Sequence, residues 1–234
     1  MRINKFISET GFCSRREADK WVESGKVTIN GETAVLGSQA KEGDDVRIDG
    51  RPLNEKKKSH VYIVLNKPVG ITSTTEQHIK GNIVDFVGHT ERIFPIGRLD
   101  KDSEGLILMT SDGDIVNKIL RAEGKHEKEY IVTVDQPITT SFLTGMAGGV
   151  KILGEMTRPC IITRISERVF KIILTEGKNR QIRRMCSAFG YSVRKLQRIR
   201  IMNITLGSLP KGKWRDLTDA EKKELSGLLN YELQ

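Results

Sequence analysis

The sequence predicts an α+β protein in which a small N-terminal α/β module precedes a larger domain. Two observations support this prediction. The polar stretch 51–60 reads as a linker between two regions, 1–50 and 61–234, that each carry their own apolar pattern. In the second region, strand patterns follow one another with shorter helical patterns between them. A chain of 234 residues is long enough for one large and one small domain.

The N-terminal module is predicted to contain two helices and three short strands. Apolar residues with helical spacing run over 3–7, and Gly11 can end that helix. The capping-box pattern Ser14-Arg-Arg-Glu17 begins a second helix, which Gly25 closes. An Asn-Gly dipeptide between the first two strands is a strong hairpin signal. The strands are expected at 27–29, 33–35 and 46–48.

The larger domain is predicted to contain six strands and four helices. The strands are expected at 61–65, 106–109, 130–134, 160–165, 169–174 and 193–206. The last of them is long enough to contain a bend. Helical patterns occupy about 112–121, 139–147 and 180–189, and the capping box Thr218-Asp-Ala-Glu221 begins a C-terminal helix.

Nearly all of the net charge of +9 lies in one short stretch. Residues 171–200 contain nine Lys or Arg and a single acid, Glu176. A basic run is often an ordinary solvated helix face, but here few local ion pairs can neutralise the charge. The concentration of charge therefore favours a polyanion as the binding partner.

Other features of the composition exclude several classes of protein. No run approaches the roughly 18 apolar residues of a membrane span, and the charged N-terminus does not resemble a signal peptide. Cys13, Cys160 and Cys186 are far apart, so we expect reduced thiols in a cytoplasmic protein. The four histidines show no zinc-ligand spacing with them, and we expect no bound metal.

The first candidate site is Ser14-Arg15-Arg16, at the start of the second predicted helix. Two cations in a first helical turn oppose the helix dipole, so the pair needs a compensating anion. A phosphate group held by the free N–H groups and both guanidinium groups would supply one. The alternative is that the arginines pair with Glu17 and Asp19 or point into water.

The second candidate site is Gly97-Arg-Leu-Asp-Lys-Asp-Ser-Glu-Gly-Leu106, a charged turn followed directly by an apolar strand. A carboxylate repels phosphate, so Asp100 in a polyanion-binding protein needs a chemical task or a cationic partner. Calcium is one alternative, because the acids match the first EF-hand positions, but Ser111 stands where the loop's final Glu belongs. A surface turn closed by ion pairs is the other alternative.

The third candidate site is the basic helix predicted at 180–189. Its apolar residues share one face, Arg180 and Arg184 point away from that face, and Arg183 lies on its border. From a border position Arg183 can reach into a cleft. We therefore expect it to form a semi-buried ion pair with an acid such as Asp100.

Together these stretches resemble the ribosomal RNA pseudouridine synthases. Gly97–Leu106 is similar to the catalytic motif of that family and Gly177–Met185 to its second conserved block, while Asn66–Pro68 and Lys128–Tyr130 match two shorter motifs. Residues 1–50 resemble an S4 RNA-binding domain. This order of domains is typical of the small-subunit-type (RsuA) branch. The resemblance implies a catalytic domain built on a mixed or antiparallel sheet flanked by helices.

The resemblance also implies a reaction. Asp100 would attack the target uridine at the uracil ring or at the ribose carbon, the N-glycosidic bond would break, and the turned uracil would form a carbon–carbon bond. No cofactor is required, which agrees with the absence of nucleotide-binding motifs in the sequence.

Roles for individual residues follow from the same resemblance. Arg183 would pair with Asp100 and keep it ionised. Tyr130 would stack on the uracil and reach the carbon that loses its proton, and Leu174 would line the base pocket. The residues expected to bind RNA are Arg15, Arg16, Lys67, Arg98, Lys101, Lys178, Arg180 and Arg184.

Three hypotheses remain distinct at this point. The leading one is an enzyme, expected to be a monomer, that modifies a uridine in 23S ribosomal RNA, with 16S ribosomal RNA or transfer RNA as alternative substrates. The second is a non-catalytic RNA-binding assembly factor, but it need not retain Asp100, Tyr130 and Arg183 together. The third is an S4-bearing methyltransferase, which would need a glycine-rich loop that 65–70 does not supply.

Overall fold

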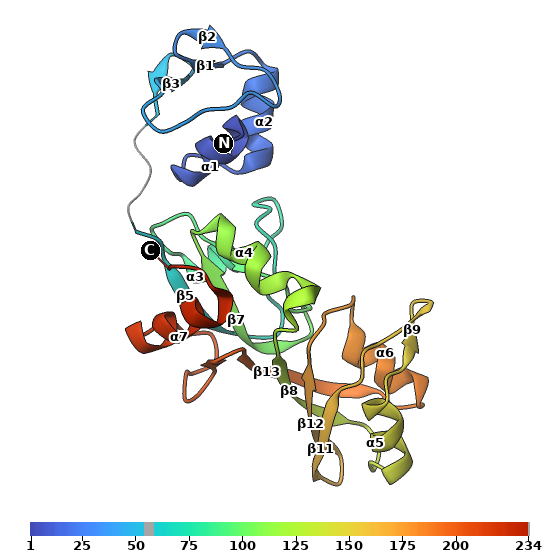
Figure 1. Cartoon of the computed structure of the whole chain (residues 1–234). Coiled ribbons are helices and arrows are strands. Elements are labelled where there is room, and N and C mark those ends of the chain that lie inside the picture. Colours follow the sequence, from blue (N-terminus) through green and yellow to red (C-terminus); the bar gives the residue numbers. More distant parts are fainter. Residues whose placement is uncertain (54–58, 234) are drawn as a thin grey trace. The chain divides into compact units, whose positions relative to one another are not determined.

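The computed structural model describes residues 1–53 and 59–233 (Figure 1). The chain forms two compact units. The first contains Met1–His60 and Ser111–Gly113, and the second contains Val61–Thr110 and Asp114–Leu233. The central residues of the predicted linker, 54–58, lie outside the described residues.

The first unit packs two helices on a small antiparallel sheet. The helices are α1 (Ile3–Glu9) and α2 (Arg15–Glu23). The strands, in sheet order, are β2 (Glu32–Thr33), β1 (Val27–Ile29), β3 (Val46–Ile48) and β4 (Arg51–Pro52). The predicted capping box forms: the Ser14 side chain accepts from the Glu17 backbone, and the Glu17 side chain accepts from the Ser14 backbone. Buried Ile7, Ala18 and Val27 belong to one core.

The second unit is built on a nine-stranded mixed sheet. Along the main path its strands are β11 (Ile161–Ser166), β12 (Val169–Leu174), β8 (Lys128–Val134), β13 (Val193–Ile201), β7 (Glu104–Thr110), β5 (Tyr62–Lys67) and β15 (Trp214–Asp216). Two short strands join this path, β14 (Ile204–Thr205) beside β13 and β6 (Phe94–Ile96) beside β7. The contact of β13 with β7 is parallel, and the other pairings are antiparallel.

Helices cover both faces of this sheet (Figure 1). One core packs the sheet against α3 (Ile83–Val87), α5 (Thr140–Ala147) and α6 (Gln181–Ala188). The core on the other face packs it against α4 (Gly113–Leu120) and α7 (Asp219–Leu229). Since residues alternate along each strand, Leu65, Ile107 and Tyr130 belong to the first core, whereas Val64 and Leu106 belong to the second.

The four predicted helices of this unit and five of its six predicted strands are present. The single strand predicted at 193–206 is wrong: the chain reverses in a turn at 202–203, so that β13 and β14 pair antiparallel as a hairpin. The capping box of Thr218 and Glu221 begins α7. The sequence did not predict α3, β6, β15 or the hairpin of β9 (Lys151–Ile152) and β10 (Glu155–Met156). These elements have two to five residues, too few to show a period.

One close backbone contact fixes the parallel pairing at the start of β7. Gly105 pairs with Arg198 of β13 and has a φ of +104°. A Cβ atom on Gly105 would lie 2.2 Å from the carbonyl oxygen of Arg198. Only glycine fits this position, since it combines a left-handed φ with no side chain. The contact aligns the end of the charged turn 97–103 with β13.

No helix among the described residues is long and apolar enough to cross a membrane.

Candidate active site

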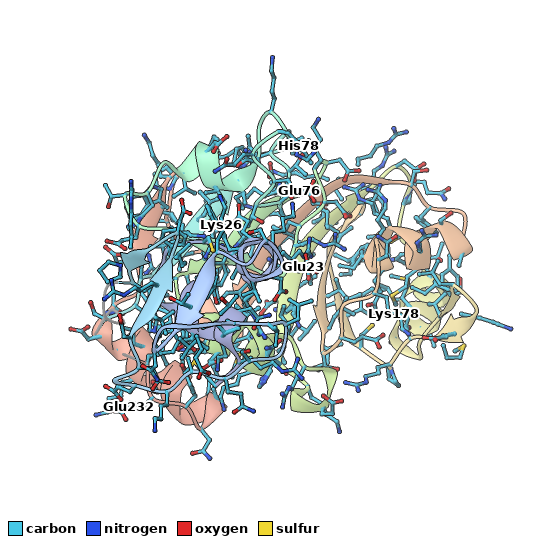
Figure 2. All side chains as sticks on the ribbon, turned by 90° about the horizontal axis from the view of Figure 1, so that it is seen from above. Glu23, Lys26, Glu76, His78, Lys178 and Glu232 are labelled. Atoms are coloured by element: carbon cyan, nitrogen blue, oxygen red, sulfur yellow. The ribbon has the colours of Figure 1, made fainter. Side chains whose placement is uncertain are left out.

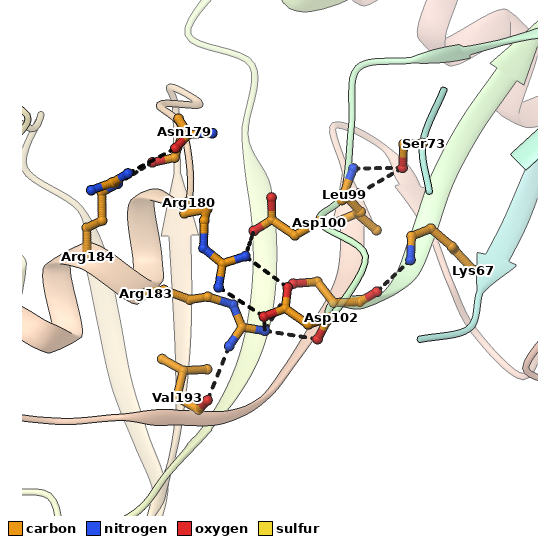
Figure 3. Close-up of polar contacts among 11 residues, drawn as sticks. Lys67, Ser73, Leu99, Asp100, Asp102, Asn179, Arg180, Arg183, Arg184 and Val193 are labelled. Carbon is orange, nitrogen blue, oxygen red and sulfur yellow. Dashed lines mark hydrogen bonds and ion pairs between the residues drawn. The ribbon is translucent and has the colours of Figure 1, made fainter. Parts of the chain in front are cut away.

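Hydrogen bonds and core packing fix the backbone of the turn that carries Asp100. Leu99 is buried in the core, and the Ser73 hydroxyl both donates to its carbonyl oxygen (2.8 Å) and accepts from its N–H (3.2 Å). The Ser103 N–H donates to the Asp100 carbonyl oxygen at 3.0 Å. Asp100 therefore stands on an anchored backbone, while its side chain stays 32% exposed (Figure 3). A reactive carboxylate needs this combination of a fixed position and open access.

Lys67 lies beneath the same turn and is fully buried. Its Nζ donates to the carbonyl oxygens of Ser103 (2.8 Å) and Pro68 (2.9 Å). Burial lowers the pKa of Lys67 to about 8, against the opposing effect of the negative charges of Asp100 and Asp102. The prediction that Lys67 contacts RNA phosphate is wrong, because a buried ammonium bound to two backbone carbonyls does not face solvent. It anchors the turn instead.

Arg180 brings a guanidinium group to the turn from the start of α6. Its Nη1 and Nη2 donate to Oδ1 (3.1 Å) and Oδ2 (2.9 Å) of Asp102, and Nη1 lies 3.6 Å from Oδ2 of Asp100 (Figure 3). Hydrogen bonding from Arg180 holds the pKa of Asp102 below its usual value. The residue that pairs with Asp100 is therefore Arg180.

Arg183 does not form the predicted ion pair with Asp100. Its Nη2 donates to the carbonyl oxygen of Asp102 (2.9 Å) and the hydroxyl of Ser103 (3.3 Å), and it lies 3.4 Å from the Asp102 carboxylate. Its Nη1 donates to the carbonyl oxygen of Val193 at 3.2 Å. Arg183 thus forms a semi-buried ion pair with an acid of this turn, as expected, but the choice of Asp100 is wrong. Arg183 lies three residues into the helix, where it reaches Asp102 and β13. Arg180, at the helix start, reaches Asp100.

Tyr130 and Leu174 lie on the sheet face that carries this turn. Both are almost fully buried, and both belong to the core that also holds Leu99. The pairing register aligns Gly105, Arg198, Tyr130 and Ile172 across four neighbouring strands, β7, β13, β8 and β12. The structure thus brings both predicted residues into the core that anchors the Asp100 turn.

Arg198 is a buried cation in this row that the sequence did not single out. It is 3% exposed, and its Nε donates to the carbonyl oxygen of Leu106 at 2.7 Å. Its Nη2 is buried and has no hydrogen-bond partner in the described part of the chain. A signal was available, since Arg198 follows Leu196 at the two-residue spacing of an inward-facing strand position. Ser73 carried no comparable signal.

The remaining predicted RNA-binding residues of the second unit lie at its surface. Arg98 and Lys101 flank Asp100 and are exposed. Arg184 is exposed and donates to the backbone and side-chain oxygens of Asn179 (3.0 and 3.1 Å). Lys178, labelled in Figure 2, pairs with Glu155 of the β9–β10 hairpin, which raises the pKa of this lysine.

Arg15 and Arg16 belong to the first unit and are exposed at the start of α2. Arg15 donates to the side-chain oxygen of Asn4 at 3.5 Å. The Glu17 side chain closes the capping box by accepting from Ser14, and Asp19 accepts from the Asn4 side chain.

The acids of the charged turn do not converge as calcium ligands. Asp102 binds the two arginines, whereas buried Glu104 pairs with Lys195 (3.1 Å) and Lys211 (2.7 Å). Burial raises the pKa of Glu104, but the two lysines outweigh this effect and lower it. Among the residues described, no group of three or more His, Cys, Asp or Glu side chains is arranged to hold a metal ion.

An S4-like unit and a mixed sheet that presents an arginine-paired aspartate define the class of protein. The chain belongs to the RNA pseudouridylate synthase family, which matches residues 61–188, and the S4 domain matches residues 1–46. It is therefore an isomerase, a pseudouridine synthase.

The chain is similar throughout its length to individual members of this class. It is 56% identical over 230 residues to the dual-specificity RNA pseudouridine synthase RluF of Escherichia coli (strain K12), covering 98% of this chain and 79% of that protein. It is 32% identical to the ribosomal large subunit pseudouridine synthase B of Bacillus subtilis (strain 168), covering 98% and 97%. A crystal structure of a pseudouridylate synthase matches 96% of this chain and 99% of its own, with a TM-score of 0.71 and 30% identity.

Proposed function

We propose that this enzyme converts a uridine of 23S ribosomal RNA to pseudouridine, with Asp100 as the nucleophile. The observation that carries the proposal is the placement of Asp100, which is anchored through Leu99, open to solvent and 3.6 Å from the Arg180 guanidinium. The guanidinium group offers a positive charge to the carboxylate, and an ionised carboxylate is the form that attacks.

The reaction is an isomerisation that needs no oxidant or reductant. Asp100 attacks the uridine, the bond from the ribose C1′ to the uracil N1 breaks, and the uracil turns within the site. A bond then forms from C1′ to the uracil C5, and the bond between Asp100 and the nucleoside breaks, which restores the free carboxylate. The hydrogen of C5 leaves as a proton, and N1 gains one. Tyr130 stacks on the uracil and can reach C5 to assist that proton loss, and Leu174 lines the base pocket.

Exposed basic residues bind the RNA. A uridine must be unstacked before it is attacked, which costs a few kcal/mol that phosphate contacts offset. Arg98, Lys101 and Arg184 are exposed on the second unit, and Lys178 can exchange its partner Glu155 for phosphate. Arg15 and Arg16 add two exposed cations from the first unit.

The proposed division of labour follows the two units. Residues 1–50 act as the S4 RNA-binding domain, 51–60 as the linker, although Arg51–Pro52 form β4, and 61–234 as the catalytic domain. The family matches over 1–46 and 61–188 support this division. We further propose that the enzyme acts as a monomer in the cytoplasm, which agrees with its three free cysteines.

The choice of 23S RNA draws on the large-subunit activity that the Bacillus subtilis relative's name records. The name of the Escherichia coli relative records dual specificity, so 16S ribosomal RNA and transfer RNA are the alternative substrates.

The test is complementation of a strain that lacks this enzyme. Wild type should restore a pseudouridine in 23S ribosomal RNA, and Asp100→Asn should restore none, because an amide is not a nucleophile. The purified variant should still bind the RNA, since its phosphate contacts are intact. Pseudouridine mapping and filter binding provide the two readouts.

Two outcomes would contradict the proposal. Equal modification by Asp100→Asn would remove Asp100 as the nucleophile. Restoration only in 16S or transfer RNA would replace the proposed substrate. The exposed acid Asp219, whose side chain lies at the surface of α7, offers the matched control Asp219→Asn, which should complement like wild type.

A further inference from the structure

The second acid of the charged turn has no role in the reaction described so far. Asp102 does not carry the reacting carboxylate, yet it receives a two-pronged hydrogen bond from Arg180 and a further contact from Arg183. Its side chain is 48% exposed and is therefore not needed to fill the core. An exposed acid that engages two arginines beside a nucleophile needs an explanation.

We propose that Asp102 is a positioning residue, which fixes the guanidinium of Arg180 at the carboxylate of Asp100. This inference rests on the proposed role of Asp100 as nucleophile. It also gives Arg180 a task other than the phosphate contact expected from the sequence.

The geometry of the contact supports positioning. Both terminal nitrogens of Arg180 are used by the two oxygens of Asp102, at 3.1 and 2.9 Å, which fixes the plane of the guanidinium group. One of these nitrogens, Nη1, is also the atom 3.6 Å from Oδ2 of Asp100. A change at Asp102 therefore moves the charge that Asp100 faces.

The backbone of Arg180 supports the same conclusion. Arg180 has a φ of +50° at the first position before α6, and its side chain makes no capping hydrogen bond there. Asn or Gly would adopt this left-handed conformation at lower cost. The cost of placing an arginine here is offset only if the guanidinium group is needed at the site.

Arg183 explains why a second negative charge is tolerated beside Asp100. It lies 3.4 Å from the Asp102 carboxylate and also donates to the Asp102 carbonyl oxygen and the Ser103 hydroxyl. Two arginines thus compensate the charge of Asp102. Asp102 therefore binds both arginines, and its own negative charge is compensated beside Asp100.

The experiment separates the rate of the reaction from RNA affinity. Total RNA from cells that lack the enzyme, grown with uridine tritiated at C5, releases tritium when any uridine is isomerised. Single-turnover rates are measured with saturating enzyme, and dissociation constants by filter binding. Asp102→Asn and Arg180→Lys should each lower the rate roughly tenfold or more, with the dissociation constant changed less than about twofold. Thermal melting verifies that each variant is folded.

A double variant tests whether Asp102 acts through Arg180. If it does, Asp102→Asn should cost almost nothing further when Arg180 is already Gln, so the two losses are not multiplicative. Asp219→Asn, which removes an exposed acid far along the chain, should leave the rate unchanged.

Three results would overturn the inference. Multiplicative losses in the double variant would show independent roles. Weaker RNA binding with an unchanged rate, or full activity of Arg180→Lys, would make Arg180 a phosphate contact, because a lysine serves that purpose as a point charge.

Failure of the proposed function has a different signature. Tritium release by Asp100→Asn at the wild-type rate would remove the nucleophile. Release confined to 16S or transfer RNA would change the proposed substrate, but the ratios of variant to wild-type rates would still test Asp102.

Discussion

At the scale of single residues, the position of the Asp100 turn depends on two residues, and we expect substitutions at either to be poorly tolerated. Gly105 permits β7 and β13 to approach, and Lys67 ties the Asp100 turn to the end of β5. Both residues are buried. Each acts by determining where the turn lies, so substitutions here are expected to change stability as well as catalysis.

Replacement of Gly105 by Ala should be strongly destabilising. The new Cβ would lie 2.2 Å from a backbone oxygen, and the residue would keep a φ of +104°. We expect a loss of about 3 kcal/mol or more in the free energy of unfolding, measured by urea denaturation. Gly227→Ala in α7 is the matched control, since a Cβ there meets nothing within 4 Å and should be neutral or stabilising. Equal stability of the two variants would contradict the proposed contact.

Lys67 should give the protein a distinctive dependence of stability on pH. Its pKa is about 8 in the folded protein, against 10.5 for an ordinary solvated lysine, so between these values the unfolded chain binds more protons. The free energy of unfolding therefore gains from this residue as pH rises through that window, and at lower pH the buried charge costs stability. Lys67→Met removes the effect. From pH 8 to pH 9.5 the wild type should gain about 1.6 kcal/mol relative to this variant. A constant difference between the two proteins in urea unfolding would refute the shifted pKa.

At the scale of elements, much of the architecture was readable from local patterns. The two capping boxes, the alternating strands and the apolar face of α6 each carry their own signal in a few neighbouring residues. The short edge strands β6 and β15 do not, because Phe94-Pro95-Ile96 contains a proline and Trp214-Arg215-Asp216 is mostly polar. Their pairing depends on β7 and β5 lying beside them.

The sequence predicted which residues form the site better than it predicted which of them contact one another. The sequence placed Asp100 and the arginines of α6 in one region, but it could not tell which arginine meets which acid. Arg180 and Arg183 are three residues apart and both face the turn. Their partners are decided by the left-handed start of α6 and by the path of β13 past Val193, both set by tertiary structure. Lys67 was misread because its burial arises from strands distant in sequence.

At the scale of the whole molecule, charge is divided between two units. The stretch 171–200 lies in the second unit, but several of its cations already pair with acids, as Lys178 does with Glu155 and Arg200 with Glu129. RNA must therefore compete with some of these pairs. The exposed arginines of α2 supply further cations from the first unit, which has its own core.

RNA binding should weaken steeply with salt, because phosphate contacts release counterions. The double variant Arg15→Gln/Arg16→Gln should reduce the slope of log affinity against log salt by about 1 to 2, one for each lost phosphate contact. Lys222→Gln/Lys223→Gln in α7 removes the same charge from a surface without a proposed role in binding. Equal slopes for both double variants would indicate that net charge alone matters. Fluorescence anisotropy at several salt concentrations measures the slopes.

The parallel pairing of β13 with β7 has a consequence for how the domain accommodates change. It joins two antiparallel half-sheets through only the pairs Gln197–Glu104 and Arg198–Gly105. Each half keeps its own hydrogen-bonded ladder, so lengthening a hairpin in either half would not disturb the other. The Asp100 turn lies where the two ladders meet. Peripheral loops can therefore diverge in length and sequence while the geometry at the junction stays the same.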